Sequence, residues 1–281
     1  MILKALFALI CMPLIGGLIV GADRKLTARM QGRFGPPLLQ PFYDVVKLCL
    51  KQRVSVNEFQ VLSVFIYFAS SALSVLLLLL RSDLLMIIFV MSIGAAFLVV
   101  GAMSVRSPYS QVGAQRELMQ MLSYEPLLIL VTVGMYLVTG SFKVSKIMMR
   151  STPMIAELPL LFFVMIIILG IKMRKSPFDI SASEHAHQEI VKGVLTDYSG
   201  PYLAMTEVAH WYDLTLLLSI AALFFYPYWI WGIISALALV VVEILIDNVS
   251  ARLTVKWMLS YSYIVGITLA AVNIGVLYFV R

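Results

Sequence analysis

Cysteine is scarce in this sequence, and charged residues are few for a chain of this length. There are two cysteines in 281 residues, Cys11 inside the first apolar run and Cys49 beyond it. A disulfide framework is therefore not expected. An iron–sulfur cluster held by this chain alone is not expected either, because such a cluster usually needs four thiolates. We expect no cofactor in this chain, so any electrons would be carried by another subunit.

The short motifs of common enzymes are also missing. There is no nucleophile elbow, no phosphate-cradling glycine loop and no dinucleotide fingerprint. Basic residues interleaved with aromatic ones, which would indicate nucleic-acid binding, do not form a stripe. We therefore expect neither a catalytic residue in this chain nor a nucleic-acid partner.

What the sequence has in excess is apolar residues. Hydrophobic residues make up 61% of the chain and charged residues 13%, about half of the ~25% usual in soluble domains. One soluble core of this size could not bury so much apolar surface, whereas a lipid bilayer accommodates it. The sequence therefore predicts an integral membrane protein.

Eight apolar runs each approach the ~20 residues that a helix needs to cross the bilayer. The first run is not a signal peptide, because its charges follow it and no small-residue cleavage site is present. Lipid satisfies no backbone hydrogen bonds, and nothing alternates like a barrel strand, so we expect an all-α polytopic membrane protein in a single domain. The expected spans are Ala5–Ala22, Phe59–Leu80, Leu84–Val105, Leu118–Thr139, Pro153–Ile171, Tyr202–Tyr226, Trp229–Ile246 and Trp257–Val280.

The distribution of basic residues predicts an orientation. Of the 21 Lys and Arg residues, 15 follow spans one, three, five and seven, and 6 lie in the other loops and the termini. Because cytoplasmic loops collect Lys and Arg, the odd-numbered loops should be cytoplasmic and both termini outside. We expect the membrane to be the cell membrane of a bacterium or archaeon.

The two long loops, 23–58 and 172–200, both belong to this cytoplasmic set. In the first, Pro41 is suited to open a helix. Phe42, Val45, Val46 and Cys49 then recur at helical spacing opposite charged residues. This pattern indicates an amphipathic helix at the membrane surface; a plain solvated connector is the alternative.

Acidic residues occur where a bilayer makes them costly. An acid at mid-bilayer costs roughly 2.5–3.5 kcal/mol, so such residues usually face a protein interior or a hydrated path. The functional interpretation is a proton or cation path, and the structural alternative is an interhelical hydrogen bond or ion pair for each acid. The acids in or at the edge of spans are Glu125, Glu157, Glu207, Asp213, Glu243 and Asp247.

The loop 172–200 adds a second titratable cluster. Two histidines, His185 and His187, are two residues apart and so do not share a helix face. The sequence is not His-Glu-x-x-His, and we expect no metal site. A relay of protons beside the membrane is favoured over a merely solvated loop. The loop's acidic residues are Asp179, Glu184, Glu189 and Asp197.

Three stretches together resemble one family, the eight-span subunit shared by respiratory complex I and membrane-bound [NiFe]-hydrogenases. The first stretch runs from Asp23 through Arg33-Phe34-Gly35-Pro36-Pro37 to Lys47. The second is Gly113-Ala114-Gln115-Arg116-Glu117-Leu118 followed by Ser123-Tyr124-Glu125-Pro126. The third comprises Ser176-Pro177-Phe178-Asp179, Gln188-Glu189-Ile190-Val191 and Asp197-Tyr198-Ser199-Gly200.

Details of these stretches resemble the energy-converting (Ech-type) hydrogenase branch. Ser107-Pro108-Tyr109-Ser110 and His187-Gln188-Glu189 look like that branch, and Ala209-His210-Trp211 stands where complex I subunits show Ala-Glu-Tyr. The resemblance implies a membrane anchor and coupling subunit of a ferredoxin-dependent, hydrogen-evolving complex that moves protons or sodium ions. It implies partners that are hydrogenase large and small subunits, a ferredoxin-like iron–sulfur subunit and an antiporter-like membrane subunit. The [NiFe] centre and [4Fe-4S] clusters would lie in those partners.

Residue roles follow from the resemblance and the acids together. The loops would dock partners through Arg33, Gln40, Asp44 and Lys47, and we expect Arg116 to stabilise Glu117 or a nearby acid. Glu207 lies one turn before His210, so both join the expected path. A quinone-binding subunit of a complex I-like dehydrogenase is the alternative within the family. A stand-alone secondary transporter is a second alternative, although no internal repeat is evident.

Overall fold

The computed structural model describes residues 2–181 and 192–280, and its regular structure within these ranges is helical. The predicted path residues Glu184, His185, His187 and Glu189 lie outside the described residues. The helices are α1 (Ile2–Met30), α2 (Gln40–Cys49), α3 (Glu58–Leu79), α4 (Leu84–Met103), α5 (Pro108–Thr139), α6 (Val144–Ile147), η1 (Met154–Ala156), α7 (Pro159–Lys172), η2 (Gly193–Leu195), α8 (Gly200–Leu223), α9 (Trp229–Val249), α10 (Val255–Tyr261), η3 (Ser262–Ile267) and α11 (Thr268–Val280).

Six helical runs of the described chain are long and apolar enough to cross a membrane. Helix α7 is apolar but has 14 residues, and α8 has 24 residues but is not among the six. Each of the eight expected spans overlaps one of the helices, and the prediction of a polytopic all-α membrane protein is confirmed. The six runs are Phe7–Met30, Glu58–Leu79, Leu84–Met103, Pro108–Thr139, Trp229–Val249 and Val255–Phe279.

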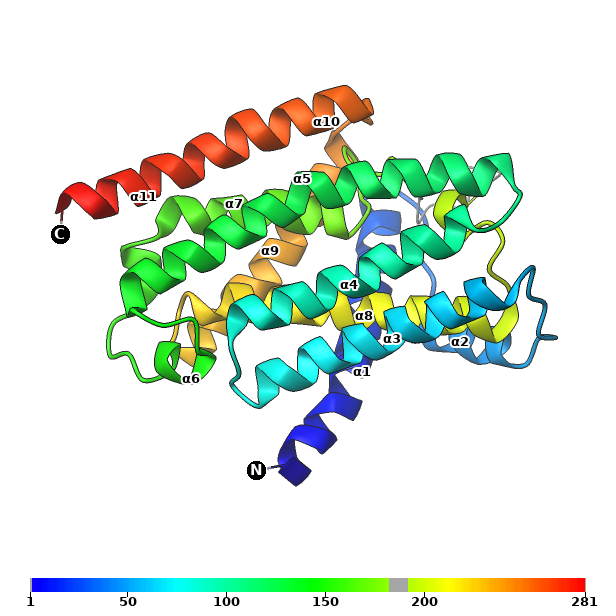
Figure 1. Ribbon diagram of the computed structural model, residues 1–281, viewed down its shortest axis with the longest axis horizontal. Coiled ribbons are helices and arrows are strands. Elements are labelled where there is room, and N and C mark those ends of the chain that lie inside the picture. Colours follow the sequence, from blue (N-terminus) through cyan, green and yellow to red (C-terminus); the bar gives the residue numbers. More distant parts are fainter. Residues whose placement is uncertain (1, 182–191, 281) are drawn as a thin grey trace.

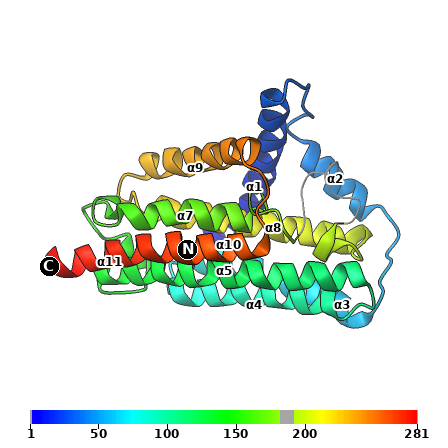
Figure 2. The same ribbon diagram turned by 90° about the horizontal axis from the view of Figure 1, so that it is seen from above.

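Helix α8 lies at the centre of the bundle, where it packs against α1, α2, α3 and α9. Helices α3, α4 and α5 lie side by side in sequence order (Figure 1). Helix α1 runs steeply across the others when the molecule is seen from above (Figure 2). The segments 23–58, 106–117, 172–181, 192–201 and 247–256 hold 15 of the 21 Lys and Arg residues. They lie toward one end of the bundle (Figure 1), which we call the basic end.

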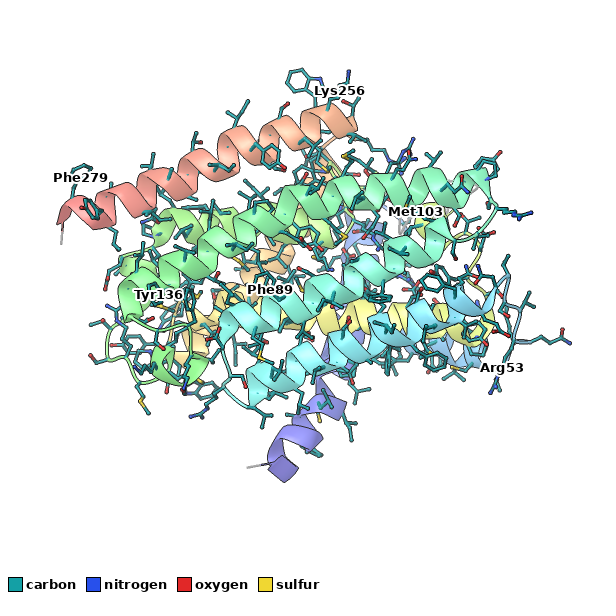
Figure 3. The ribbon with its side chains drawn as sticks, in the orientation of Figure 1. Arg53, Phe89, Met103, Tyr136, Lys256 and Phe279 are labelled. Carbon is teal, nitrogen blue, oxygen red and sulfur yellow. The ribbon has the colours of Figure 1, made fainter. Side chains whose placement is uncertain are left out.

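The outer surface of the bundle is apolar, as lipid contact requires. Phe89, Tyr136 and Phe279 all point outward from different helices (Figure 3). The side chain of Phe279 is 87% exposed. Such an apolar surface is costly in water but not in contact with the hydrocarbon core of a bilayer.

Two helices extend further than expected, and in each case local chemistry explains it. Helix α1 continues past Ala22 to Met30 because Asp23 and Arg24, expected in a loop, have ionic partners at Lys175 and Asp44. Helix α5 begins at Pro108 rather than at 118, because proline is preorganised for the first helical turn.

The predicted amphipathic helix is present as α2, with Pro41 in its first turn. The ring centroid of Phe42 lies 5.2 Å from that of Trp211 on α8, so this side of α2 faces the bundle. Val46 and Cys49, expected on the same apolar side, are exposed instead. The bundle covers only part of the predicted apolar face.

Candidate functional site

The segment 172–181 is the most heavily ion-paired part of the described chain. It begins at the last residue of α7 and carries three cations, Lys172, Arg174 and Lys175, followed by Asp179. Arg174 has a positive φ of 52°, a left-handed conformation that costs a non-glycine residue roughly 1–2 kcal/mol. This turn lets neighbouring cations point toward different helices.

Lys172 reaches into the centre of the bundle. Its Nζ lies 2.9 Å from Oδ2 of Asp213 on α8 and 3.5 Å from the hydroxyl oxygen of Tyr124 on α5. Tyr67 on α3 donates its hydroxyl proton to the same Asp213 oxygen at 3.1 Å. Four helices, α3, α5, α7 and α8, therefore meet at one buried charge pair.

Arg174 pairs with Glu117 on α5. Its NH2 lies 2.9 Å from Glu117 Oε1, and the Ser181 hydroxyl donates to Oε2 at 2.5 Å. Burial by itself lowers the pKa of Arg174, but the adjacent Glu117 carboxylate outweighs it and raises that pKa above its usual value. Arg116, expected to stabilise Glu117 or a nearby acid, donates to the Ile180 carbonyl at 3.3 Å. Among the described residues the cation paired with Glu117 is Arg174, and a nearby acid as the partner of Arg116 stays a prediction.

Lys175 ties the segment to α1. Its Nζ lies 2.5 Å from Asp23 Oδ1, and both side chains are buried. Asp23 also accepts a hydrogen bond from Thr27 at 3.4 Å. This pair fixes the extended end of α1 against the segment.

Asp179 and Asp247 join the segment to α9 and the residues after it. Arg252 Nε donates to Asp179 Oδ2 at 2.6 Å, and the Ser176 backbone N–H donates to Asp247 Oδ1 at 2.9 Å. Burial raises the pKa of Asp179, and Arg252 opposes that rise. This part of the loop is therefore not solvated; it is folded into the protein.

Glu243 lies on the same face of α9 as Asp247, one turn earlier. It is buried, and its Oε1 makes no hydrogen bond within the described residues. Its Oε2 is 2.9 Å from where a Cβ on Gly170 would stand. The glycine on α7 thus leaves room for a carboxyl group with spare hydrogen-bonding capacity.

The remaining predicted path residues lie apart from the segment. Glu125 is half-buried near the middle of α5, and its Oε1 has no hydrogen-bond partner within the described chain. Glu157 pairs with Arg150 at the end of the bundle opposite the basic end. Glu207 pairs with Lys192 at 2.8 Å. His210 is buried on α8, and Asp197 Oδ2 is buried without a hydrogen bond to described residues.

The predicted docking residues cluster around Asp44 on α2. Gln40 donates to Asp44 at 3.1 Å, Lys47 lies 3.6 Å away, and Arg24 on α1 approaches to 3.0 Å. Arg33 instead hydrogen-bonds to Gln31 in the loop before α2. Asp44 therefore holds α2 against α1.

Sequence reasoning missed the cations that partner the acids. The sequence positions of Lys172, Arg174, Lys175 and Arg252 indicate only an orientation, and nothing in the sequence singles out Tyr67. The available signal was a run of three cations directly after an apolar helix and before Ser-Pro-Phe-Asp, in a chain rich in intramembrane acids. Groups of three or more His, Cys, Asp or Glu side chains that could hold a metal ion do not occur among the described residues.

Comparison with known proteins identifies the family. A model of the NADH dehydrogenase family matches residues 3–278. The H subunit of NADH-quinone oxidoreductase from Syntrophotalea carbinolica is 26% identical, covering 91% of this chain and 88% of the relative. Hydrogenase-4 component C of Escherichia coli is 28% identical, covering 74% of this chain and 70% of the relative.

A solved structure has the same fold. It is a chain of the membrane-bound sulfane sulfur reductase, an archaeal respiratory membrane complex, with a TM-score of 0.84 over 98% of both chains and 23% identity. The helical architecture and the family match over nearly the whole sequence agree. The chain belongs to the NADH dehydrogenase family of membrane subunits, and it is a membrane subunit of a complex I-like complex.

Proposed function

We propose that this chain is the membrane anchor and coupling subunit of a ferredoxin-dependent, hydrogen-evolving energy-converting [NiFe]-hydrogenase. Its partners are the hydrogenase large and small subunits, a ferredoxin-like iron–sulfur subunit and an antiporter-like membrane subunit. Those partners hold the [NiFe] centre and the [4Fe-4S] clusters. The complex lies in the cell membrane, with both termini of this chain outside.

The observation that carries the coupling role is the set of buried ion pairs on the segment 172–181. Lys172, Arg174 and Lys175 pair with acids on α8, α5 and α1, respectively. Because the three cations lie within four residues of one another, a small displacement of the segment changes all three pairs together. The segment is thus suited to convert movement at the basic end into changes of charge inside the bundle.

Charge balance gives this movement a consequence. A buried carboxylate that loses its cation is unstable as an anion and takes up a proton instead. Partners that dock at the basic end and change shape with their redox state would shift the segment, and the acids would then bind or release protons. The rearranged ion pairs also change the electric field in an adjoining subunit. A sodium ion there would respond to that field as a proton does.

Two features support the hydrogenase branch within the family. Hydrogenase-4 component C is among the relatives, as given above. The pocket between α1, α2 and α8 has six charged residues among its eleven lining residues, whereas small-molecule sites are mostly apolar. A neutral quinone ring fits that lining poorly.

Purification of the native complex through a tag on this chain tests the proposal. We expect a nickel–iron subunit among the co-purified chains and hydrogen evolution from reduced ferredoxin. Quinone-dependent, inhibitor-sensitive activity without a nickel–iron subunit would replace the proposal with the quinone-binding alternative, which the NADH-quinone oxidoreductase relatives favour. Ion transport by the isolated chain in liposomes would instead indicate a stand-alone transporter.

Glu125→Gln should uncouple ion movement from electron transfer. The change removes a titratable group from the middle of α5 but keeps the shape of the side chain. The free energy of unfolding should therefore change by less than about 1 kcal/mol. Proton transfer through this position should slow by about 10²-fold. The measurement is ions moved per electron in proteoliposomes, with Glu58→Gln at the exposed start of α3 as the control. An unchanged ratio in Glu125→Gln would remove this residue from the path.

Asp44→Ala should weaken assembly of the complex more than it lowers the turnover of the complex that does assemble. It deletes the ion pair of Asp44 to Arg24 on α1, whose side chains are 32% and 35% exposed, and its pair to Lys47 on α2 itself, which is 65% exposed. Together these exposed pairs stabilise α2 by about 1 kcal/mol. The yield of intact complex should fall about fivefold, while turnover per assembled complex stays the same. Glu58→Ala, another acid at the basic end, is the matched control. Normal yield from Asp44→Ala would argue against a docking role for this loop.

A further inference from the structure

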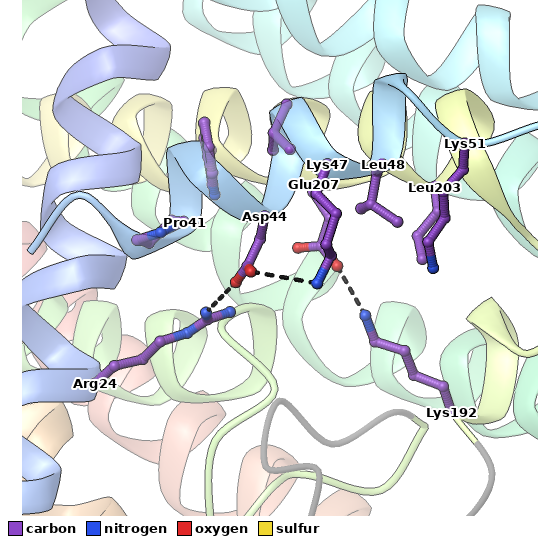
Figure 4. A pocket seen from close by; sticks show the side chains of 11 residues that line it. Arg24, Pro41, Asp44, Lys47, Leu48, Lys51, Lys192, Leu203 and Glu207 are labelled. Atoms are coloured by element: carbon purple, nitrogen blue, oxygen red, sulfur yellow. Dashed lines mark hydrogen bonds and ion pairs between the residues drawn. The ribbon is translucent and has the colours of Figure 1, made fainter. Parts of the chain in front are cut away.

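A pocket of about 230 Å³ lies between α1, α2 and α8 (Figure 4). Its charged lining comes from Arg24, Lys47, Lys51, Lys192, Asp44 and Glu207. Its apolar lining includes Leu48, Leu203 and Trp211. The pocket lies outside the ion pairs of the segment 172–181.

The cations of this pocket outnumber its acids by four to two. Asp44 is shared by Arg24 and Lys47, and Glu207 is paired with Lys192 (Figure 4). Lys51 forms no ion pair within the described residues and is exposed. The pocket therefore carries two positive charges without an acid of their own, which favours an anionic ligand.

The position of the pocket matches the headgroup layer of a bilayer. Leu203, Glu207 and Trp211 occupy the first three turns of α8 at the basic end, and Arg24 lies near the end of α1. Three turns of helix span roughly 16 Å. That depth corresponds to the polar layer and the adjoining edge of the hydrocarbon core.

An exposed apolar stripe on α2 runs beside the charged residues of this helix that line the pocket. Leu39, Tyr43, Val46 and Leu50 recur at helical spacing and are all exposed, Leu50 by 83%. Asp44, Lys47 and Lys51 occupy the neighbouring face, toward the pocket. A charged pocket flanked by an exposed apolar stripe is the arrangement that a headgroup with attached acyl chains requires.

We propose that this pocket binds the phosphate-bearing headgroup of an anionic phospholipid, with the acyl chains along the exposed stripe of α2. The pocket is too small for a whole lipid, since sites for drug-sized molecules alone take roughly 300–1,000 Å³. Lys51 supplies a charge that no acid of the described chain neutralises. The bound lipid would fix α2 between α1 and the bilayer.

Native mass spectrometry of the full-length chain released from nanodiscs tests this proposal. The nanodiscs contain equal amounts of phosphatidylglycerol and phosphatidylcholine. We expect the wild-type chain to retain phosphatidylglycerol preferentially, and Lys51→Ala to reduce the preference about fivefold, the effect of one charge near a membrane surface. Because Lys51 is exposed and pairs with no acid of the described chain, its loss should leave folding unchanged. Lys256→Ala, at an exposed lysine of the same end, should retain the wild-type preference.

Three outcomes would overturn the proposal. The first is equal retention of both lipids by the wild-type chain. The second is complete loss of the preference in millimolar inorganic phosphate, which would identify a soluble anion as the ligand. The third is displacement of the lipid by the purified partner subunits, which would assign the pocket to a protein carboxylate. The first two readouts require neither electron transfer nor a partner subunit, so they are independent of the hydrogenase proposal.

Discussion

Replacing Lys172 by methionine is expected to destabilise the folded chain by about 3–5 kcal/mol. Asp213 is fully buried, and its strongest partner is the ammonium group 2.9 Å away. Methionine fills most of the lysine's volume, so the cost comes from the unpaired carboxylate rather than from a cavity. Thermal unfolding in detergent measures the effect, and Lys256→Met at an exposed position should change stability by no more than about 0.5 kcal/mol. A loss below about 1 kcal/mol in Lys172→Met would mean that the pair is not buried in the native protein.

The double variant Lys172→Met/Asp213→Asn separates stability from coupling. With both charges gone, the amide oxygen of the introduced asparagine can still accept the hydrogen bond that Tyr67 now gives to Asp213. Most of the lost stability should return, because neutral replacements of a buried pair are often tolerated. Coupling should stay lost, since no titratable acid remains at this point. Unfolding midpoints and ion transport measured on the same preparations distinguish the two effects.

Gly113→Ala should destabilise the chain by about 1–3 kcal/mol through overpacking. Gly113 is buried on α5, and an added Cβ would lie 2.3 Å from the Val194 backbone nitrogen and 2.4 Å from the Gly193 carbonyl carbon. Backbone atoms cannot swing aside as a side chain does, so η2 must move away from α5. Asp197 and Tyr198 lie two and three residues after the end of η2 and would move with it. The free energy of unfolding measures the change.

Gly275→Ala is the matched control for that substitution. Gly275 is also helical, on α11, but an added Cβ there meets nothing within 4 Å. Alanine should therefore leave stability unchanged or raise it by roughly 0.5–1 kcal/mol, because it is the better helix former. Equal effects of the two substitutions would show that α5 and η2 are not in close contact.

The sequence predicts the helices of this protein well, because the apolar runs needed for lipid contact are visible without knowledge of their packing. Pro41 and the charges on α2 likewise indicated a helix at the position where one is found. Helix ends were less accurate: Asp23 and Arg24 read as loop residues because their partners, Lys175 and Asp44, are distant in sequence.

The sequence predicts the acids of the candidate site but not the cations that pair with them. The acids drew attention because charge inside a membrane is costly, but that cost says nothing about which cation offsets it. The sequence suggests Arg116 as a partner of Glu117 or of a nearby acid, whereas the fold pairs Glu117 with Arg174, which is 57 residues away. Pairings of this kind depend on how α7 sits against α5 and α8, and no spacing within one helix encodes that.

Ion movement per electron in proteoliposomes tests the coupling role most directly. The purified complex would be supplied with reduced ferredoxin, and hydrogen formed and ions moved would be recorded together for the wild type and for Lys172→Met/Asp213→Asn. We expect the double variant to assemble and form hydrogen while its ratio of ions to electrons falls well below that of the wild type. An unchanged ratio in an assembled, active complex would contradict the role assigned to the segment 172–181.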